Sequence, residues 1–104
     1  MFDKAYICII AEPQLDHSCN RFKFNSGYSR PIFGGPNNYK IKKGNHKVII
    51  ESGNGESWVV EANVDYNQML TIKLNLVGGN ISGVNYKVAS APAGMGLVCA
   101  MSLD

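Results

Sequence analysis

The sequence predicts one small all-β domain, an antiparallel β-sandwich of about seven strands. Apolar and polar residues alternate with a period of two, and turn residues interrupt this pattern every 8 to 12 positions or so. The 104 residues match the common size of one domain and leave no room for a second core. We therefore expect residues 1–90 to form the sandwich.

Two dense apolar runs predict central strands that are buried on both faces. Residues 6–10 form the first run and residues 48–50 form the second. Runs of this kind, bounded by turn residues, are typical of strands with protein packed on either side.

Four segments alternate cleanly and predict half-buried strands. In Leu70–Leu76, leucine and isoleucine fill every second position and polar residues fill the positions between. A helix would scatter these residues around its circumference, because its faces repeat every 3.6 positions. The other three segments have the expected inward sets Phe22 and Phe24; Trp58, Val60, Ala62 and Val64; and Val84, Tyr86 and Val88.

Glycine, proline and asparagine mark the connections. The run Gly34-Gly35-Pro36-Asn37-Asn38 predicts a loop, because glycine permits positive φ and proline removes a ladder donor. Residues 43–45, 52–55 and 77–80 predict tight turns, which give three consecutive hairpins between about Tyr39 and Val88.

The pattern changes after Ser90. Residues 91–104 are predicted to form an extra C-terminal strand or an apolar tail, either docked on the domain or leading to a partner. An exposed apolar tail would favour a homodimer formed by strand addition.

Composition narrows the function classes. A net charge of +2 is too mild to indicate nucleic acid or an anionic membrane by itself, and no apolar run is long enough to span a bilayer. Three cysteines without CxxC spacing favour free thiols and a cytoplasmic location. Cys8 and Cys99 lie in apolar runs and are expected to be core residues.

The segment Tyr39–Ile50 resembles the Gly-x-His hairpin of PEGA-like bacterial β-sandwich repeats, and Leu70–Leu74 resembles their final strands. The resemblance covers roughly residues 20–88, although the Pro-Glu-Gly-Ala tetrad itself is missing. It implies a small Ig-like or prealbumin-like sandwich that serves as an accessory module and is not an enzyme.

One polar cluster has the residue types of a catalytic or metal site. Cys19 has His17 and Asp16 nearby, and His46 or Glu12 could complete four metal ligands. However, the spacing matches no familiar zinc pattern, and no oxyanion-hole motif accompanies the thiol. We expect a loop of ordinary polar residues, with no metal, cofactor or catalysis.

The expected binding residues surround the loop from Tyr28 to Tyr39, which places aromatic side chains where a plain connection would not need them. We single out Tyr28, Arg30, Phe33, Tyr39, Lys40, Lys42 and Lys43. Exposed aromatic rings beside lysines would suit single-stranded nucleic acid, and aromatic rings alone would suit a glycan. Acidic residues on the following strands could instead pair with the lysines across the sheet.

The sequence thus predicts a non-enzymatic interaction module that binds another protein or domain through its loops or an edge strand. The alternative is a β domain that binds carbohydrate or single-stranded nucleic acid.

Overall fold

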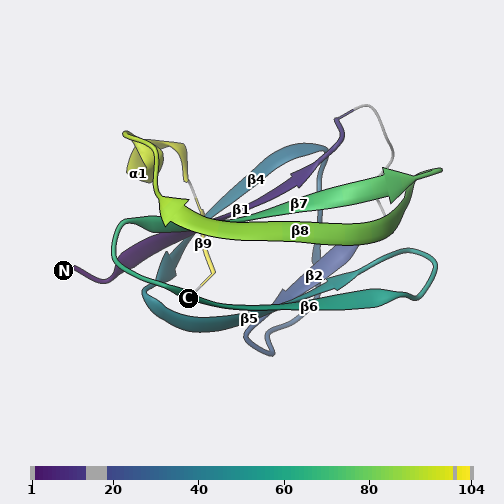
Figure 1. The fold of residues 1–104 in the computed structure, drawn as a ribbon, viewed down its shortest axis with the longest axis horizontal. Coiled ribbons are helices and arrows are strands. Elements are labelled where there is room, and N and C mark those ends of the chain that lie inside the picture. Colours follow the sequence, from purple (N-terminus) through teal and green to yellow (C-terminus); the bar gives the residue numbers. More distant parts are fainter. Residues whose placement is uncertain (1, 14–18, 100, 104) are drawn as a thin grey trace.

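The computed structural model describes residues 2–13, 19–99 and 101–103 and confirms an all-β sandwich of two sheets (Figure 1). Its described residues form nine strands and one short helix; β3 and β9 span two residues each, and the other seven strands are longer. The elements are β1 Lys4–Ala11, β2 Arg21–Phe24, β3 Arg30–Pro31, β4 Gly35–Lys42, β5 Gly44–Glu51, β6 Ser57–Val64, β7 Gln68–Val77, β8 Asn80–Ser90, α1 Met95–Val98 and β9 Met101–Ser102.

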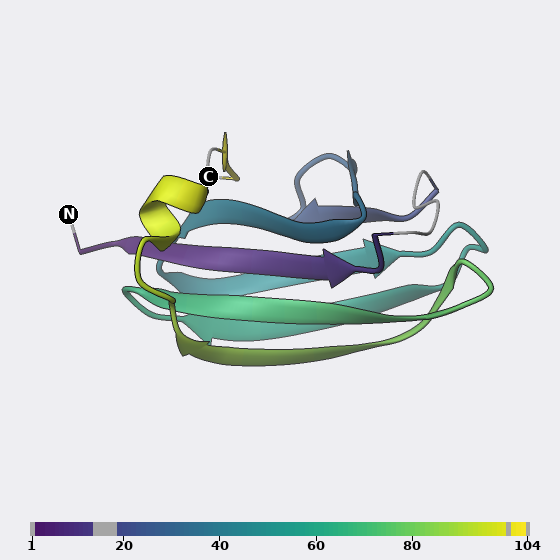
Figure 2. The same ribbon diagram turned by 90° about the horizontal axis from the view of Figure 1, so that it is seen from above.

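The first sheet has the strand order β8-β7-β1-β4-β9 and is built around β1 (Figure 2). Ala5, Ile7 and Ile9 face the second sheet and are buried. Tyr6 and Cys8, on the opposite face of β1, are buried as well. The prediction of a strand covered on both sides is therefore confirmed for residues 6–10.

The second sheet has the order β3-β2-β5-β6, and on its outer face charged and polar residues surround the apolar pair Ile49 and Val59. Lys23 Nζ lies 3.7 Å from a carboxylate oxygen of Glu51, and Lys47 is directly opposite Glu61 in the ladder. An ion pair of the expected kind therefore forms between Lys23 and Glu51, and Lys47 faces Glu61 in the ladder.

Two of the three predicted hairpins form, and the first does not. β5 pairs with β6, and β7 pairs with β8, but β4 and β5 belong to different sheets. Gly44 has φ +139°, a conformation that side-chain-bearing residues rarely adopt, and there the chain crosses from one sheet to the other. Tyr39–Ile50 is thus a crossing between layers instead of a hairpin.

The predicted loop at Gly34–Asn38 is also wrong in part, because β4 begins at Gly35 and pairs with the end of β1. Pro36 is tolerated because β9 covers β4 only at Tyr39 and Lys40, so this part of β4 needs no ladder donor toward β9.

The pairing is mostly antiparallel but includes two parallel pairs, β1 with β7 and β4 with β9. All of the second sheet lies between β1 and β7 in the sequence. After β6 the chain therefore returns to the end of the first sheet where β1 begins, and β7 then runs parallel to β1.

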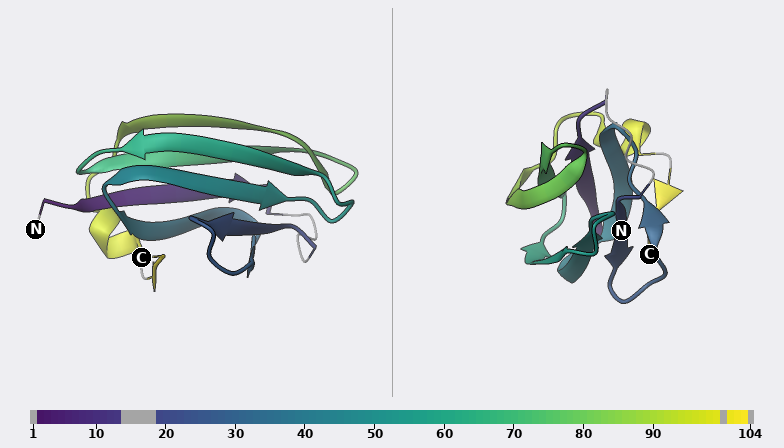
Figure 3. Two further views of the ribbon diagram at one scale, coloured as in Figure 1. Left: turned by 90° about the horizontal axis from the view of Figure 1, so that it is seen from below. Right: turned by 90° about the vertical axis from the view of Figure 1, so that its right-hand side faces the viewer.

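The interior between the sheets is one apolar cluster to which every strand longer than two residues contributes. It includes Phe22, Val48, Ile50, Val60 and Ile72, all fully buried. Trp58, expected to anchor the core, is half-buried and packs against this cluster. End-on, the two layers are seen in Figure 3.

Residues 91–99 pack on the outer face of the first sheet. Met95 and Cys99 pack with Tyr6 in a second, smaller cluster, so α1 covers one half of this face. Farther along, β9 pairs with β4, and the Leu103 N–H donates to the Lys40 carbonyl oxygen at 3.0 Å. Among the described residues, no helix is long and apolar enough to cross a membrane.

Because two thiols are buried, the free energy of unfolding should decrease at alkaline pH. Burial raises the pKa of Cys8 above its ordinary value of 9.0, and the neighbouring Cys99 adds to this. Burial also raises the pKa of Cys99, although Lys40 opposes the shift. Because thiols in the unfolded chain ionise first, the free energy of unfolding should fall as pH rises through 9.0. Chemical denaturation between neutral pH and about pH 10 measures this fall. A fall of the same size in the variant with Cys8→Ala and Cys99→Ala would contradict the assignment.

Candidate functional site

The loop before β4 carries the exposed aromatic residues predicted to bind, but one of them already has a partner. Tyr28 is 73% exposed and Phe33 is 62% exposed. The Arg30 guanidinium carbon lies 4.7 Å from the centre of the Tyr28 ring, and Arg30 Nη2 donates to the Tyr28 hydroxyl at 3.0 Å. Arginine thus covers one face of the ring that a base or sugar would stack on.

Tyr39 does not contribute an exposed ring. It is only 7% exposed, and the centre of its ring lies 5.6 Å from that of Phe22 inside the sandwich. Burial raises the pKa of Tyr39, and the charge of Arg30 opposes this. The expectation of an exposed aromatic group at Tyr39 is wrong because alternation along β4 turns this residue toward the core.

The basic residues are divided between opposite faces. Lys40 and Lys42 lie on the outer face of the first sheet, in register with Tyr6 and Lys4. Lys43 follows at the crossing into the second sheet, where its backbone N–H donates to the Asp3 carbonyl oxygen. Three further basic residues, Arg21, Lys23 and Lys47, lie on the outer face of the second sheet. The structure therefore does not gather these charges beside one set of exposed rings.

The polar cluster around Cys19 falls partly outside the described residues, which include neither Asp16 nor His17. Cys19 itself is exposed. In the part of the chain that the structure describes, no three His, Cys, Asp or Glu side chains are placed to hold a metal ion.

His46, considered as a fourth ligand, has a structural environment instead. Asn25 Nδ2 donates to His46 Nδ1 at 2.8 Å, and His46 Nε2 donates to the Lys42 carbonyl oxygen. The ring also stacks on Phe24, with 5.0 Å between centres. Both ring nitrogens are thus already hydrogen-bonded within the fold.

The sandwich has one open side, which sequence reasoning missed. The edges at β3 and β9 are strands of two residues, whereas β6 and β8 run for 8 and 11 residues along the other side (Figure 3). Among the described residues, no strand pairs with the outer edge of β8. Long exposed edges of this kind are templates for another strand.

Tyr86 lies on this edge and is exposed, although the alternation of its strand predicts that it faces the core. Its ladder partner Ile72 is fully buried, so Tyr86 faces the second sheet as its alternation predicts. Even so, Tyr86 is 53% exposed, because β8 has no neighbour on its other side. The expectation that Tyr86 is buried is wrong for this reason.

A groove of about 310 Å³ lies on the outer face beside β8. Ile10 and Thr71 contribute to its lining, together with Lys73 and Lys87. It occupies the half of the first sheet away from α1, which packs over Tyr6. Side chains of a strand added to β8 would reach this groove.

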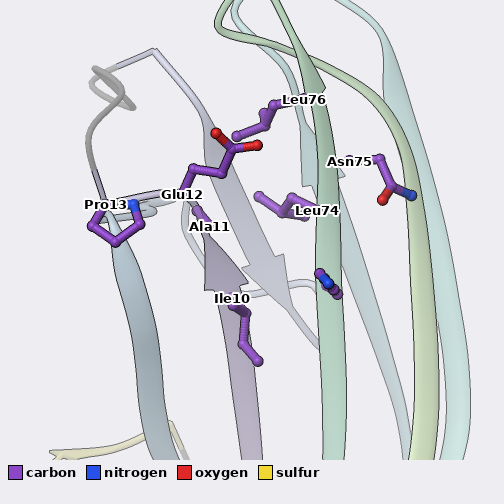
Figure 4. A pocket seen from close by; sticks show the side chains of 8 residues that line it. Ile10, Ala11, Glu12, Pro13, Leu74, Asn75 and Leu76 are labelled. Carbon is purple, nitrogen blue, oxygen red and sulfur yellow. The ribbon is translucent and has the colours of Figure 1, made fainter.

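A second hollow, of about 440 Å³, shares Ile10 and Lys73 with this groove and opens where β1 ends (Figure 4). β1 pairs with β7 only as far as Lys73, whereas β7 continues to Val77. The hollow lies between residues 11–13 and residues 74–76, with the Glu12 side chain at its rim (Figure 4).

The comparisons with known proteins add no assignment to this geometry. No family model, no curated protein and no solved structure matches the chain.

Proposed function

We propose that this chain is a non-enzymatic interaction module that binds an extended segment of another polypeptide along the edge of β8. The observation that carries the proposal is the unpaired edge of β8 on the open side of the five-stranded sheet, where residues 83–90 pair with β7 without a shift in register. An added strand would gain main-chain hydrogen bonds, and the groove on the outer face would select the side chains on that side.

One feature of β8 favours it over β6 as the receptor strand. The groove lined by Lys73 and Lys87 lies directly beside β8. Charge alone does not separate the two edges, because each strand carries one charged residue, Glu61 in β6 and Lys87 in β8.

A partner strand would also cover the apolar side chains on the inner face of β8. Val84 and Val88 are half-buried and pack against the core, with Tyr86 between them. A partner strand with apolar residues at matching positions would cover these side chains, which is the usual source of cross-strand stabilisation.

The proposal is tested by selecting peptides from a displayed random library on the immobilised chain and measuring their affinity for two variants. Tyr86→Lys places a charge where the partner's apolar side chains would lie. We expect it to weaken binding by about tenfold or more. The variant loses the cross-strand apolar contacts of Tyr86 and buries a lysine charge under the partner strand.

Leu97→Lys is the matched control, because Leu97 is 93% exposed on α1, which packs over Tyr6 of β1 instead of forming part of the β8 edge. It should leave the affinity unchanged. If the selected peptides bind both variants equally, or lose affinity only for Leu97→Lys, binding does not occur at β8 and the proposal fails.

A further inference from the structure

The charge distribution around β8 indicates what kind of strand it accepts, an inference that depends on the proposed function. From Gln68 to Ser90, which spans β7 and β8, the only charged residues are Lys73 and Lys87. Both line the same groove on the outer face. The part of the first sheet that β7 and β8 form therefore carries two positive charges and no negative charge.

Lys87 is placed to meet a neighbouring strand directly. It lies on the edge strand opposite Thr71, while Lys73 lies one strand further in, opposite Asn85. The two lysines are thus diagonal neighbours on one face. Glu12, at the rim of the adjoining hollow, lies beyond the end of β1, and β7 separates it from β8.

A second copy of this chain would not satisfy these charges. In an antiparallel pair of β8 strands centred on Tyr86, Lys87 would lie opposite Asn85 of the other copy. The joint outer face would then carry Lys73 and Lys87 from each copy with no acidic residue from β7 or β8 between them. Like charges on one sheet face destabilise the pairing.

We therefore propose that β8 binds a partner strand in which acidic and apolar residues alternate. The acidic side chains would lie on the outer face, beside Lys87 and the groove that contains Lys73. The apolar side chains would lie on the inner face and cover Val84, Tyr86 and Val88. Alternation puts each set on one face of the added strand.

The test uses soluble synthetic peptides of about ten residues, a typical strand length. In one, valine and glutamate alternate; in the other, glutamine replaces each glutamate. Fluorescence anisotropy measures their affinity for the full chain at low and at high salt. We expect the glutamate peptide to bind about five- to tenfold more tightly at low salt, and this preference to shrink at high salt.

Two double variants test whether the preference for the glutamate peptide depends on Lys73 and Lys87. Lys73→Gln with Lys87→Gln should remove it. Lys43→Gln with Lys47→Gln removes the same charge from elsewhere and should leave it intact. If the preference is equal in both variants, it reflects net charge and the inference is overturned.

The outcomes separate this inference from the proposed function. If both peptides bind equally and both lose affinity for Tyr86→Lys, strand addition stands but the acidic partner is excluded. If neither peptide binds, and the library yields no peptide sensitive to Tyr86→Lys, both proposals fail. If the chain sediments as a dimer that Tyr86→Lys dissociates, the occupant of β8 is a second copy and the acidic partner is again excluded.

Discussion

Replacing Asn37 with alanine should lower the free energy of unfolding by about 2 to 4 kcal/mol, because one buried and three part-buried hydrogen bonds are lost together. Asn37 is 6% exposed. Its Oδ1 accepts from the Phe33 N–H at 2.9 Å, and its Nδ2 donates to the carbonyl oxygens of Ile9, Phe33 and Gly35 at 2.9, 2.8 and 3.2 Å. One side chain thus fixes the chain before β4 onto β1.

Urea denaturation measures this loss, with Asn63→Ala as the control. Asn63 is exposed on the outer face of β6 and should change stability by less than about 0.5 kcal/mol. Asn37→Asp separates shape from hydrogen bonding, because it keeps the acceptor but directs a second oxygen at three carbonyl groups. It should be at least as destabilising as alanine. A stable Asn37→Asp variant would show that donation by Asn37 does not hold this segment.

Sequence patterning predicted which residues face the interior. The alternation in Leu70–Leu76 and the dense run at residues 6–10 correspond to β7 and β1 as expected, because a strand's faces follow directly from its period of two. The burial of Cys8 and Cys99 followed from the same reasoning.

Patterning did not predict which strands become neighbours. Residues 43–45 were expected to close a hairpin, and instead the chain crosses between sheets at Gly44. Turn residues predict that the chain reverses direction. Which sheet the next strand joins depends on contacts between residues that are distant in sequence. The parallel pairing of β1 with β7 has the same origin.

The site at the edge of β8 was not predicted, because the sequence pattern does not show which strand lies at the edge of a sheet. The alternation around Tyr86 predicts a half-buried strand equally well in the middle of a sheet and at its edge. The one available signal was the absence of acidic residues from Gln68 to Ser90, which leaves two lysines unbalanced there. The predicted site lay at Tyr28–Tyr39, where the structure pairs Tyr28 with Arg30 and buries Tyr39.

Backbone amide hydrogen exchange on β8 tests strand addition most directly. Successive N–H groups of a strand point to opposite sides, so half of those in β8 bond to β7 and the others face outward. The outward amides should exchange rapidly in the free chain. When the bound strand accepts hydrogen bonds from them, they should slow by roughly tenfold or more.

The measurement is made by NMR on the full chain, with and without the peptide of alternating valine and glutamate. The account predicts new protection at every second amide between Gly83 and Ser90, with β3 and the Tyr28 loop unchanged. Protection confined to residues 25–34 or to α1, or equal at all amides, would contradict a partner strand on β8.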